Sequence, residues 1–488
     1  MRLVRARRTY HFAAMNQLAV GLRCCAALIF GLRGSSLVSS YDSPDQGFSF
    51  VHGPSVEAGT FSTWRSKVQI VEKSQKYVLL FQIRFSSAFS TIPAMQAHAT
   101  LFSQIIAGLY PSEFARLAEA FPTSKPTRGL SHYDQFLALC FGQLTYRESL
   151  RDVVACLNSR KSLLYHLGFR GHISRTNLAY ANKHRDWRLY QAVAELLMRR
   201  AARLYQTECL DADLPNMVFA LDSSIISLAL NLFPWGYYAR TRKAALKLHL
   251  LLSLKGNVPA WGAITDPHVA DLRMLDQVPI YPGAYYIMDR GYMDFVRLFR
   301  FHKAGAFFVV RCKEPVSFKV CHSASVDKTK GLKCDQTVRL KSNWSAKSYP
   351  EPLRKIRVYD PEHKNMIVLL TNDFSLPAEI IAELYKRRWQ VELFFKWIKQ
   401  HLRIRSFFGR SENAVRGQIW TAICAYLLVA ILRKQNELSK SLNEILQIVS
   451  VSIFDQLPVA DLLGTERQFA QSIQNERDIQ KCFSFNNL

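Results

Sequence analysis

The amino-acid sequence predicts an α/β fold with a mixed sheet, preceded by a helical domain. Short apolar runs, rich in β-branched and aromatic residues or strictly alternating, recur between residues 217 and 311. Apolar residues at i, i+3 and i+4 dominate between residues 95 and 205. The chain has 488 residues, of which 49% are apolar, so it can bury a large core and form more than one domain.

Helical periodicity is clearest at residues 133–144 and 189–198. Between them, Ser174 or Thr176 could cap a further helix. That helix would carry basic side chains, namely Lys183, His184, Arg185 and Arg188. A basic helix after a Gly-containing turn suits a module that binds a DNA end, although a charged helix face is more often only solvated.

Two predicted strands each carry one aspartate. Residues 217–226 form an apolar run that is interrupted by Asp222, and residues 285–288 form another that is followed by Asp289. A buried carboxylate needs a partner or a metal ion, whereas an aspartate at a strand end is also frequent as a turn or cap residue. Four competing carboxylates lie nearby, namely Asp266, Asp271, Asp276 and Asp294. We interpret Asp271 and Asp276 as solvated or structural.

Between the two aspartates, residues 245–255 alternate as a half-buried antiparallel strand, which returns over residues 258–265. A further strand is predicted at residues 305–311. Three antiparallel strands, a helix, a strand, a helix and a strand make the order expected of a ribonuclease-H-like fold. His249 lies on the polar face of its strand and is predicted to be structural.

The segment 383–399 is predicted to be one helix with an ordered polar stripe. Tyr385, Arg388, Glu392 and Lys399 have offsets of 0, +3, +7 and +14, which place them within about 60° of each other. A carboxylate flanked by three donors that suit phosphate is what a metal-dependent enzyme acting on a nucleic-acid backbone needs. The alternative is a solvated face of i,i+3 and i,i+4 pairs.

This Tyr-x2-Arg-x3-Glu-x6-Lys spacing resembles the signature of bacterial insertion-sequence transposases of family four, which use an Asp-Asp-Glu triad. The contexts of Asp222 and Asp289 resemble the family's first two catalytic motifs, with Ser224 where the family more often has Thr. The resemblance covers roughly residues 95–435. It implies that Asp222, Asp289 and Glu392 are catalytic and hold two Mg²⁺ ions, for which Mn²⁺ can substitute, during an in-line phosphoryl transfer.

The resemblance also implies that Tyr385, Arg388 and Lys399 bind phosphates near the end of the mobile element. The expected partners are DNA, both the terminal inverted repeats and the target, and a second copy of the chain in a homodimer on DNA. The function implied is a DNA transposase. Two alternatives stay open: a catalytically silent DNA-binding remnant, and a ribonuclease-H-like nuclease without strand transfer.

An insertion is predicted between the second and third acids, because the separation of 392 − 289 = 103 residues is too long for one strand and a connecting helix. Residues 313–371 are rich in Ser, Lys and β-forming residues, which indicates a β-rich insertion. Trp344 has polar neighbours and is a candidate for stacking on an unpaired or flipped base, unless it covers the insertion's own core. Three residues of the insertion match no zinc pattern: Cys321, His322 and Cys334.

Composition agrees with a nucleic-acid partner. The 64 Lys and Arg residues against 38 Asp and Glu give a formal charge of +26, which attracts phosphate backbones. Ten irregularly spaced cysteines suggest reduced thiols, so we expect a cytoplasmic, nucleoid-associated protein. The apolar run at residues 419–432 is too short for a membrane span and is predicted to be a buried helix, with no membrane partner.

The predicted domain boundaries follow from these patterns. Residues 1–94 begin with a basic stretch that could start a secretory signal, but we expect them to be a disordered leader before an authentic start at Met95. The remaining segments are a helical DNA-end-binding domain (95–210), the first part of the core (211–312), the insertion (313–371), the second part of the core (372–435) and a tail (436–488).

Overall fold

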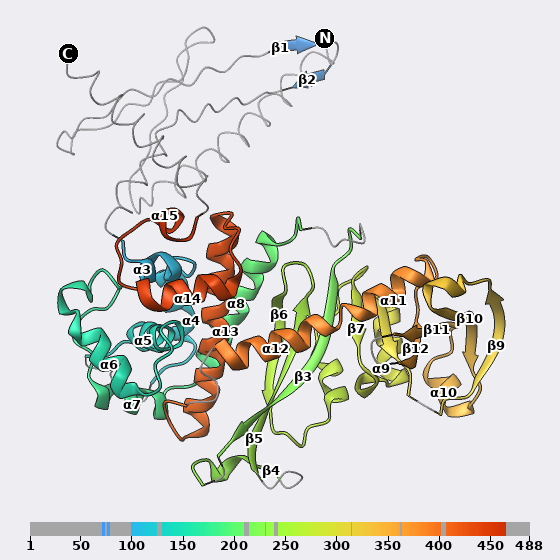
Figure 1. Cartoon of the computed structure of the whole chain (residues 1–488), viewed down its shortest axis with the longest axis horizontal. Coiled ribbons are helices and arrows are strands. Elements are labelled where there is room, and N and C mark those ends of the chain that lie inside the picture. The colour runs from blue at the N-terminus through green and yellow to red at the C-terminus, as the bar shows by residue number, and fades with distance from the viewer. Residues whose placement is uncertain are drawn as a thin grey trace, which may run out of the picture. The chain divides into compact units, whose positions relative to one another are not determined.

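The computed structural model describes residues 71–73, 76–78, 99–123, 129–208, 214–229, 231–238, 243–313, 315–361, 364–401 and 407–464 (Figure 1). The chain divides into two units, Met1–Ser86 and Ser87–Leu488. In the first unit, β1 (Val71–Lys73) and β2 (Lys76–Val78) pair as an antiparallel hairpin. The rest of the predicted leader and the start at Met95 lie outside the described residues.

The region before the sheet is made of helices, and serine side chains begin several of them. Its elements are α3 (Leu101–Ile106), α4 (Pro111–Glu119), α5 (His132–Leu144), α6 (Leu150–Ser159), α7 (Arg175–His184) and α8 (Arg188–Leu204). Ser131 and Ser149 form capping boxes with the acids three residues later, and Ser174 accepts from the Asn177 N–H at the start of α7. These caps satisfy N–H groups that a helix leaves unpaired in its first turn.

Two of the four basic residues predicted for one helix, Arg185 and Arg188, lie outside α7, which corrects that prediction. Arg185 ends α7 with an extended backbone and is only 6% exposed. Its guanidinium donates to the Ser131 carbonyl at 2.8 Å and to the Gln135 side chain at 3.0 Å, so it joins α7 to the start of α5. Arg188 begins α8 and pairs with Asp186 at 2.6 Å.

A mixed sheet forms the centre of the second unit, which confirms the predicted α/β class. Its strand order is β4-β5-β3-β7-β8-β12-β11-β10-β9, and β6 pairs with β5. The first strands are β3 (Val218–Leu228), β4 (Tyr237–Tyr238), β5 (Lys243–Ser253), β6 (Val258–Thr265), β7 (Tyr285–Met288) and β8 (Phe307–Arg311). The neighbours β3, β7 and β8 run parallel, and helix α9 (Phe295–Lys303) connects β7 to β8.

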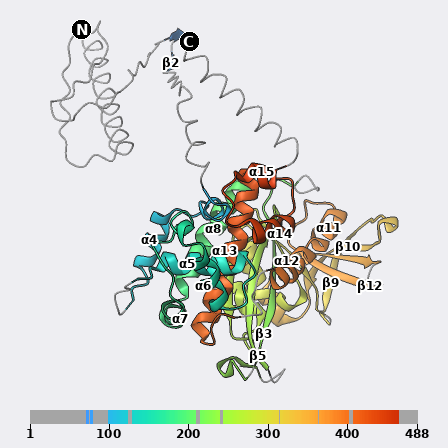
Figure 2. The ribbon, with the colours of Figure 1, turned by 60° about the vertical axis from the view of Figure 1, so that its left-hand side comes forward.

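The inserted segment continues the same sheet rather than forming a sheet of its own. It contains β9 (Phe318–Ala324), β10 (Leu332–Leu340), α10 (Asn343–Ser348), β11 (Leu353–Asp360) and β12 (Asn365–Thr371). Strand β12 pairs antiparallel with β8, with Leu369 opposite Arg311 and Thr371 opposite Val309. The insertion strands therefore lie at one end of the sheet, and helices α4–α8 lie at the other side of the unit (Figures 1 and 2).

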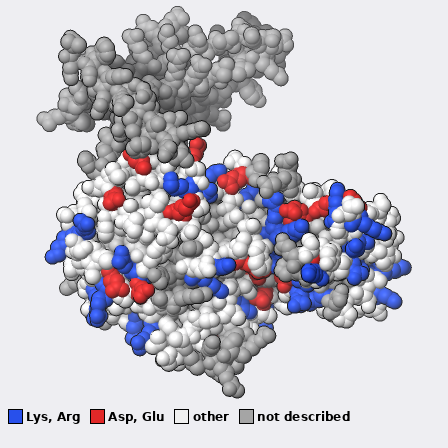
Figure 3. Space-filling view, viewed as in Figure 1, with Lys and Arg blue, Asp and Glu red and all other residues white. Residues whose placement is uncertain are grey.

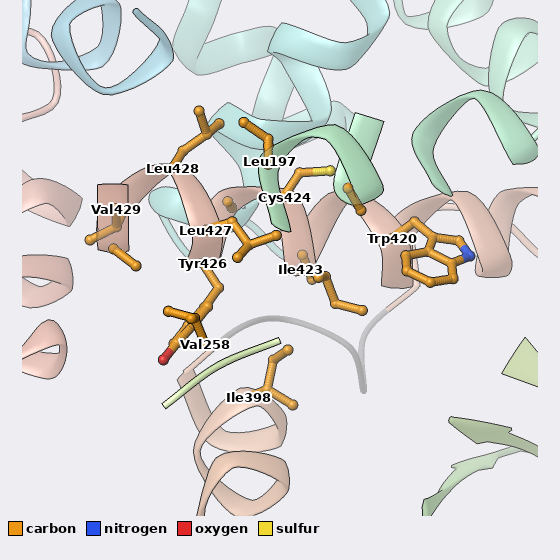
Figure 4. Close-up of a cluster of buried hydrophobic side chains, with 14 of the residues drawn as sticks. Leu197, Val258, Ile398, Trp420, Ile423, Cys424, Tyr426, Leu427, Leu428 and Val429 are labelled. Carbon is orange, nitrogen blue, oxygen red and sulfur yellow. The ribbon is translucent and has the colours of Figure 1, made fainter. Parts of the chain in front are cut away.

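Helix α13 (Glu412–Gln435) is the centre of the main core. Its side chains pack against Leu197 of α8, Val258 of β6 and Ile398 of the preceding helix, α12 (Trp389–His401) (Figure 4). By length and composition α13 could cross a membrane, but 94% of its most apolar stretch is buried inside the protein. The prediction of a buried helix over residues 419–432 is therefore confirmed. Helices α14 (Leu442–Ser452) and α15 (Val459–Leu463) follow it.

The polar stripe predicted on one helix is divided between two helices. Helix α11 (Ala378–Lys386) contains Tyr385, and α12 (Trp389–His401) contains Glu392 and Lys399. Arg388 lies in the break, where its N–H bonds to the Tyr385 carbonyl three residues back at 3.1 Å. Tight i,i+3 hydrogen bonds thus replace the α-helical pattern, and the prediction of one continuous helix is wrong.

Candidate active site

Two of the three predicted acids lie where the pairing of the neighbouring parallel strands β3 and β7 ends. The pairing of β3 with β7 ends at Leu221 opposite Met288, so Asp222 and Asp289 are the next residues on each strand. Parallel strands deliver their carboxyl ends to the same edge of a sheet, where open α/β sheets form their ligand sites. The third acid, Glu392, is in the first turn of α12, which packs against β3.

Arg388 forms ion pairs with two of the three acids, Asp222 and Glu392. One terminal nitrogen of its guanidinium is 3.3 Å from Asp222 Oδ2, and the other is 2.6 Å from Glu392 Oε1. The three side chains are 15%, 20% and 33% exposed, so the pairs are shielded but reachable from solvent. Helix α12 therefore contacts β3 through charge as well as through apolar packing.

Tyr385 and Lys399 contact the same site. The Tyr385 hydroxyl donates to Asp289 Oδ1 at 3.3 Å, and its ring lies 5.8 Å from the Arg388 guanidinium carbon. Lys399 Nζ donates to Ser224 Oγ at 2.5 Å. Because side chains alternate along a strand, Ser224 lies on the same face of β3 as Asp222. The structure thus brings together all six residues that the sequence predicted here for catalysis and phosphate contacts.

A cavity of about 420 Å³ opens beside the acids. Its walls include Asp222, Ser224, Glu392, Lys396 and Lys399. Carboxylates on β3 and α12 therefore face ammonium groups one and two turns further along α12. Such a cavity has ligands for a cation and donors for a phosphate within one hollow.

Burial and negative charge raise the pKa of Asp222 to about 6. Desolvation is the largest cause, and the charges of Glu392 and Asp289 act in the same direction, against the Ser223 N–H and Arg388. Burial lowers the pKa of Arg388, but Tyr385, Glu392 and Asp222 outweigh it and the pKa is raised. Burial also raises the pKa of Tyr385 to about 12, so its hydroxyl stays protonated and can donate.

The donor set suits a divalent cation, but the arrangement does not yet form a metal site. Carboxylate oxygens are the ligands that hard divalent cations prefer, and Asp222, Ser224 and Glu392 line one cavity. Within the described part of the chain, no three acid, His or Cys side chains are close enough to hold one ion. The Arg388 guanidinium lies between Asp222 and Glu392, where a cation would have to enter.

The competing carboxylates are engaged elsewhere. Asp294 caps α9 by accepting from the Arg297 N–H at 3.0 Å, and Asp276 pairs with the same arginine at 2.7 Å. Asp266 accepts from the His268 N–H at 2.8 Å. Asp271 contacts Ser223 and Lys247 on the other face of β3. Sequence reasoning missed this last set of contacts, because residues 48 positions apart give no periodic signal.

Trp344 is not at this cavity. It lies in α10 of the insertion, where 68% of it is exposed, so it does not cover a core. The insertion also carries exposed basic residues, including Lys319, Arg339, Lys341 and Lys347. On the face shown in Figure 3, Lys and Arg side chains gather over the insertion strands at the right.

Residues 214–428 match a protein family described as "Transposase DDE domain". This range contains the sheet, the insertion, the three acids and most of α13. Residues 97–170 match a second family, described as "Domain of unknown function (DUF4372)", which covers α3 to α6.

Three curated sequences are similar to about half of the chain. "Putative transposase y4zB" of Sinorhizobium fredii is 36% identical over 248 residues, which cover 50% of this chain and 68% of that protein. "Probable transposase for insertion sequence element IS5377" of Geobacillus stearothermophilus is 30% identical, over 48% of this chain and 61% of that protein. "Putative transposase for insertion sequence element IS4SA" of Synechocystis is 24% identical, over 56% of this chain and 76% of that protein.

A solved structure of the piggyBac transposase synaptic complex with hairpin DNA aligns with 74% of this chain and 80% of that chain. The TM-score is 0.37 and the identity is 10%, a similarity that does not establish a shared fold.

Proposed function

Because the chain belongs to the bacterial insertion-sequence transposases with an Asp-Asp-Glu domain, we propose that Asp222, Asp289 and Glu392 are its catalytic triad and that they cut and join DNA by metal-dependent phosphoryl transfer. One observation carries this proposal. Two acids directly follow the last paired residues of the neighbouring parallel strands β3 and β7, and the third is held against the first of them by a shared arginine. A structural ion pair would not need the second strand's acid at the same edge.

We infer a ribonuclease-H-like core from the strand order, and membership of insertion-sequence family four from a residue spacing. Around β3, the order is β6-β5-β3-β7-β8, with the first three strands antiparallel and the last two parallel to β3. Along the chain, three antiparallel strands come before two parallel ones, which is the chain order that we expect of such a core. The family-four assignment rests on the Tyr385, Arg388, Glu392 and Lys399 spacing, whose side chains reach one site despite the helix break.

In this proposal Asp222, Asp289 and Glu392 hold divalent cations, Mg²⁺ or Mn²⁺ in its place, whose charge activates the attacking oxygen and stabilises the leaving oxygen. The chain's own residues orient the groups involved. The Tyr385 hydroxyl holds Asp289, and the Ser223 N–H holds Asp222 at 2.8 Å. Arg388 would compete with cations for Asp222 and Glu392, and a DNA phosphate is the ligand that its planar guanidinium fits in exchange.

We propose DNA as the partner of three surfaces. Arg388 and Lys399 would bind phosphates of the element's inverted repeat beside the triad, and Tyr385 would add a hydroxyl donor. The exposed Trp344 would stack on an unpaired base, with the basic insertion around it binding the backbone. The helical region 95–210 would bind the element end, and a homodimer would hold two ends in the nucleoid.

The test uses labelled DNA that carries the end of the element. Purified chain with Mg²⁺ should nick the end at its junction with flanking DNA and then join the freed 3′-hydroxyl to a plasmid. Chelation of the metal should stop both steps. Binding without nicking would favour the silent remnant, and nicking without joining would favour the nuclease.

A further inference from the structure

Polar side chains from two strands converge on Asp271, on the face of β3 opposite the cavity. Ser223 Oγ donates to Asp271 Oδ1 at 2.7 Å. Lys247 Nζ lies 3.3 Å from the same oxygen and also donates to the Val269 carbonyl at 2.8 Å. His249, the cross-strand partner of Ser223, is fully buried with Nδ1 3.7 Å from that oxygen. Asp271 itself begins the short 3₁₀ helix η3 (Asp271–Asp276).

These contacts do not make Asp271 a metal ligand. Side chains alternate along a strand, so Ser223 points away from the face that carries Asp222 and Ser224. Ser224 is the residue that contacts Lys399 of α12. Asp271 binds Ser223 and therefore lies behind the strand, with β3 between it and the cavity.

The contact matters because β3 is supported on one edge only at this point. Its pairing with β7 ends at Leu221, whereas its pairing with β5 continues to Leu228. Beyond Leu221, the Ser223 N–H donates to Asp222 Oδ1 at 2.8 Å instead of to a strand. The orientation of the Asp222 carboxylate thus depends on where Ser223 lies.

We propose that Asp271 is a positioning residue for Asp222. It fixes Ser223 through the hydroxyl, and Ser223 fixes the Asp222 carboxylate through its backbone N–H. Lys247 holds Asp271 in place from the neighbouring strand. The inference rests on the proposed function, in which Asp222 holds a divalent cation. Partners behind a ligand typically change metal affinity or activity by about 10-fold to 100-fold when they are removed.

The test compares variants of the full chain: Asp271→Ala, Ser223→Ala, the double variant and Ser223→Thr. Mn²⁺ binding is measured without DNA from the electron paramagnetic resonance signal of the free ion, and folding is checked by thermal melting. The Mn²⁺ dependence of nicking is a second readout. Asp276→Ala is the matched control, because it is in the same 3₁₀ helix but pairs with Arg297 and Arg300.

Asp271→Ala and Ser223→Ala should each weaken Mn²⁺ binding by about 10-fold or more. The double variant should be no weaker than the single ones, because both break the same connection. Ser223→Thr keeps a hydroxyl and should bind Mn²⁺ like the wild type, and so should Asp276→Ala. If Asp271→Ala does not melt cooperatively, Ser223→Ala, which removes only one hydroxyl, carries the test.

Two outcomes overturn the inference while leaving the proposed function intact. One is wild-type Mn²⁺ affinity in folded Asp271→Ala and Ser223→Ala. The other is additive losses in the double variant, which would mean that the two residues act separately. A wild-type chain that neither binds Mn²⁺ nor nicks DNA would overturn the proposed metal site itself.

Discussion

Arg388 donates to Glu392 across one turn of the chain, with 2.6 Å between Nη2 and Oε1. The same guanidinium reaches Asp222 at 3.3 Å from the other terminal nitrogen, so one positive charge holds two of the three acids together. In the proposed reaction that charge has to be exchanged for divalent cations. The ion pairs therefore connect DNA binding, which would draw Arg388 to a phosphate, with metal binding.

Replacing Arg388 should change metal and DNA binding in opposite directions. Arg388→Ala removes a cation from between Asp222 and Glu392, so DNA-free chain should bind Mn²⁺ more tightly than wild type. It should bind the element end more weakly, by about 1.5–3 kcal/mol for a lost charge-assisted contact. Calorimetry and gel-shift titration measure the two quantities. Unchanged affinity for both ligands would mean that Arg388 forms only structural ion pairs.

Lys399 should contribute to DNA binding, because its ammonium group lies beside the acids and donates to Ser224. Lys399→Ala should weaken end binding and reduce the salt dependence by about one counterion. Lys434→Ala is the control, since Lys434 pairs with Glu208 at 2.9 Å at the end of α13. Gel shifts over a salt series decide the point, and equal slopes in wild type and Lys399→Ala would speak against a phosphate contact.

The raised pKa of Asp222 predicts a pH dependence of stability. Burial raises this pKa from 3.8 to about 6, so the folded chain holds a proton that the unfolded chain has released. Stability of the metal-free chain should therefore fall as the pH rises through this window. Asp222→Asn should remove that part of the dependence. Urea unfolding at several pH values measures it, and identical pH dependence in both proteins would contradict the assigned shift.

Replacement by alanine should affect DNA binding at one tryptophan and stability at another. Trp344 is 68% exposed, so Trp344→Ala should leave the melting temperature unchanged while weakening binding to ends with an unpaired base by about 1–3 kcal/mol. Trp420 is fully buried in the α13 core, so Trp420→Ala should destabilise the fold by about 3–5 kcal/mol. Thermal melts and binding to paired and unpaired ends would test this. Wild-type binding by Trp344→Ala would remove the stacking role.

The sequence predicted much of the sheet because short apolar or alternating runs are a local signal of strands. Asp222 and Asp289 were selected by their places in and after such runs and by the resemblance of their contexts to family motifs, and the buried α13 was predicted from its uncharged run. The break at Arg388 could not be predicted, because residues 383–399 contain neither Gly nor Pro and their helical periodicity is continuous. Arg185 was misplaced on a basic helix face, since only the tertiary structure shows that its guanidinium binds the start of α5.

The other features that the sequence did not predict are contacts between distant segments of the chain. The Asp271 contacts join three segments of the chain, and no repeat of 2 or 3.6 residues connects them. The insertion gave a β-rich signal, but its pairing to β8 depends on strand order and not on composition.

The central claim is that Asp222, Asp289 and Glu392 form one metal-dependent site. Its most direct test is Mg²⁺-dependent nicking of labelled element ends by Asp222→Asn, Asp289→Asn and Glu392→Gln, with end binding measured in parallel. Each variant should lose nicking and keep nearly wild-type binding, because the charge removed faces metal rather than phosphate. Nicking at the wild-type rate by any one of the three would show that its acid is not part of the site.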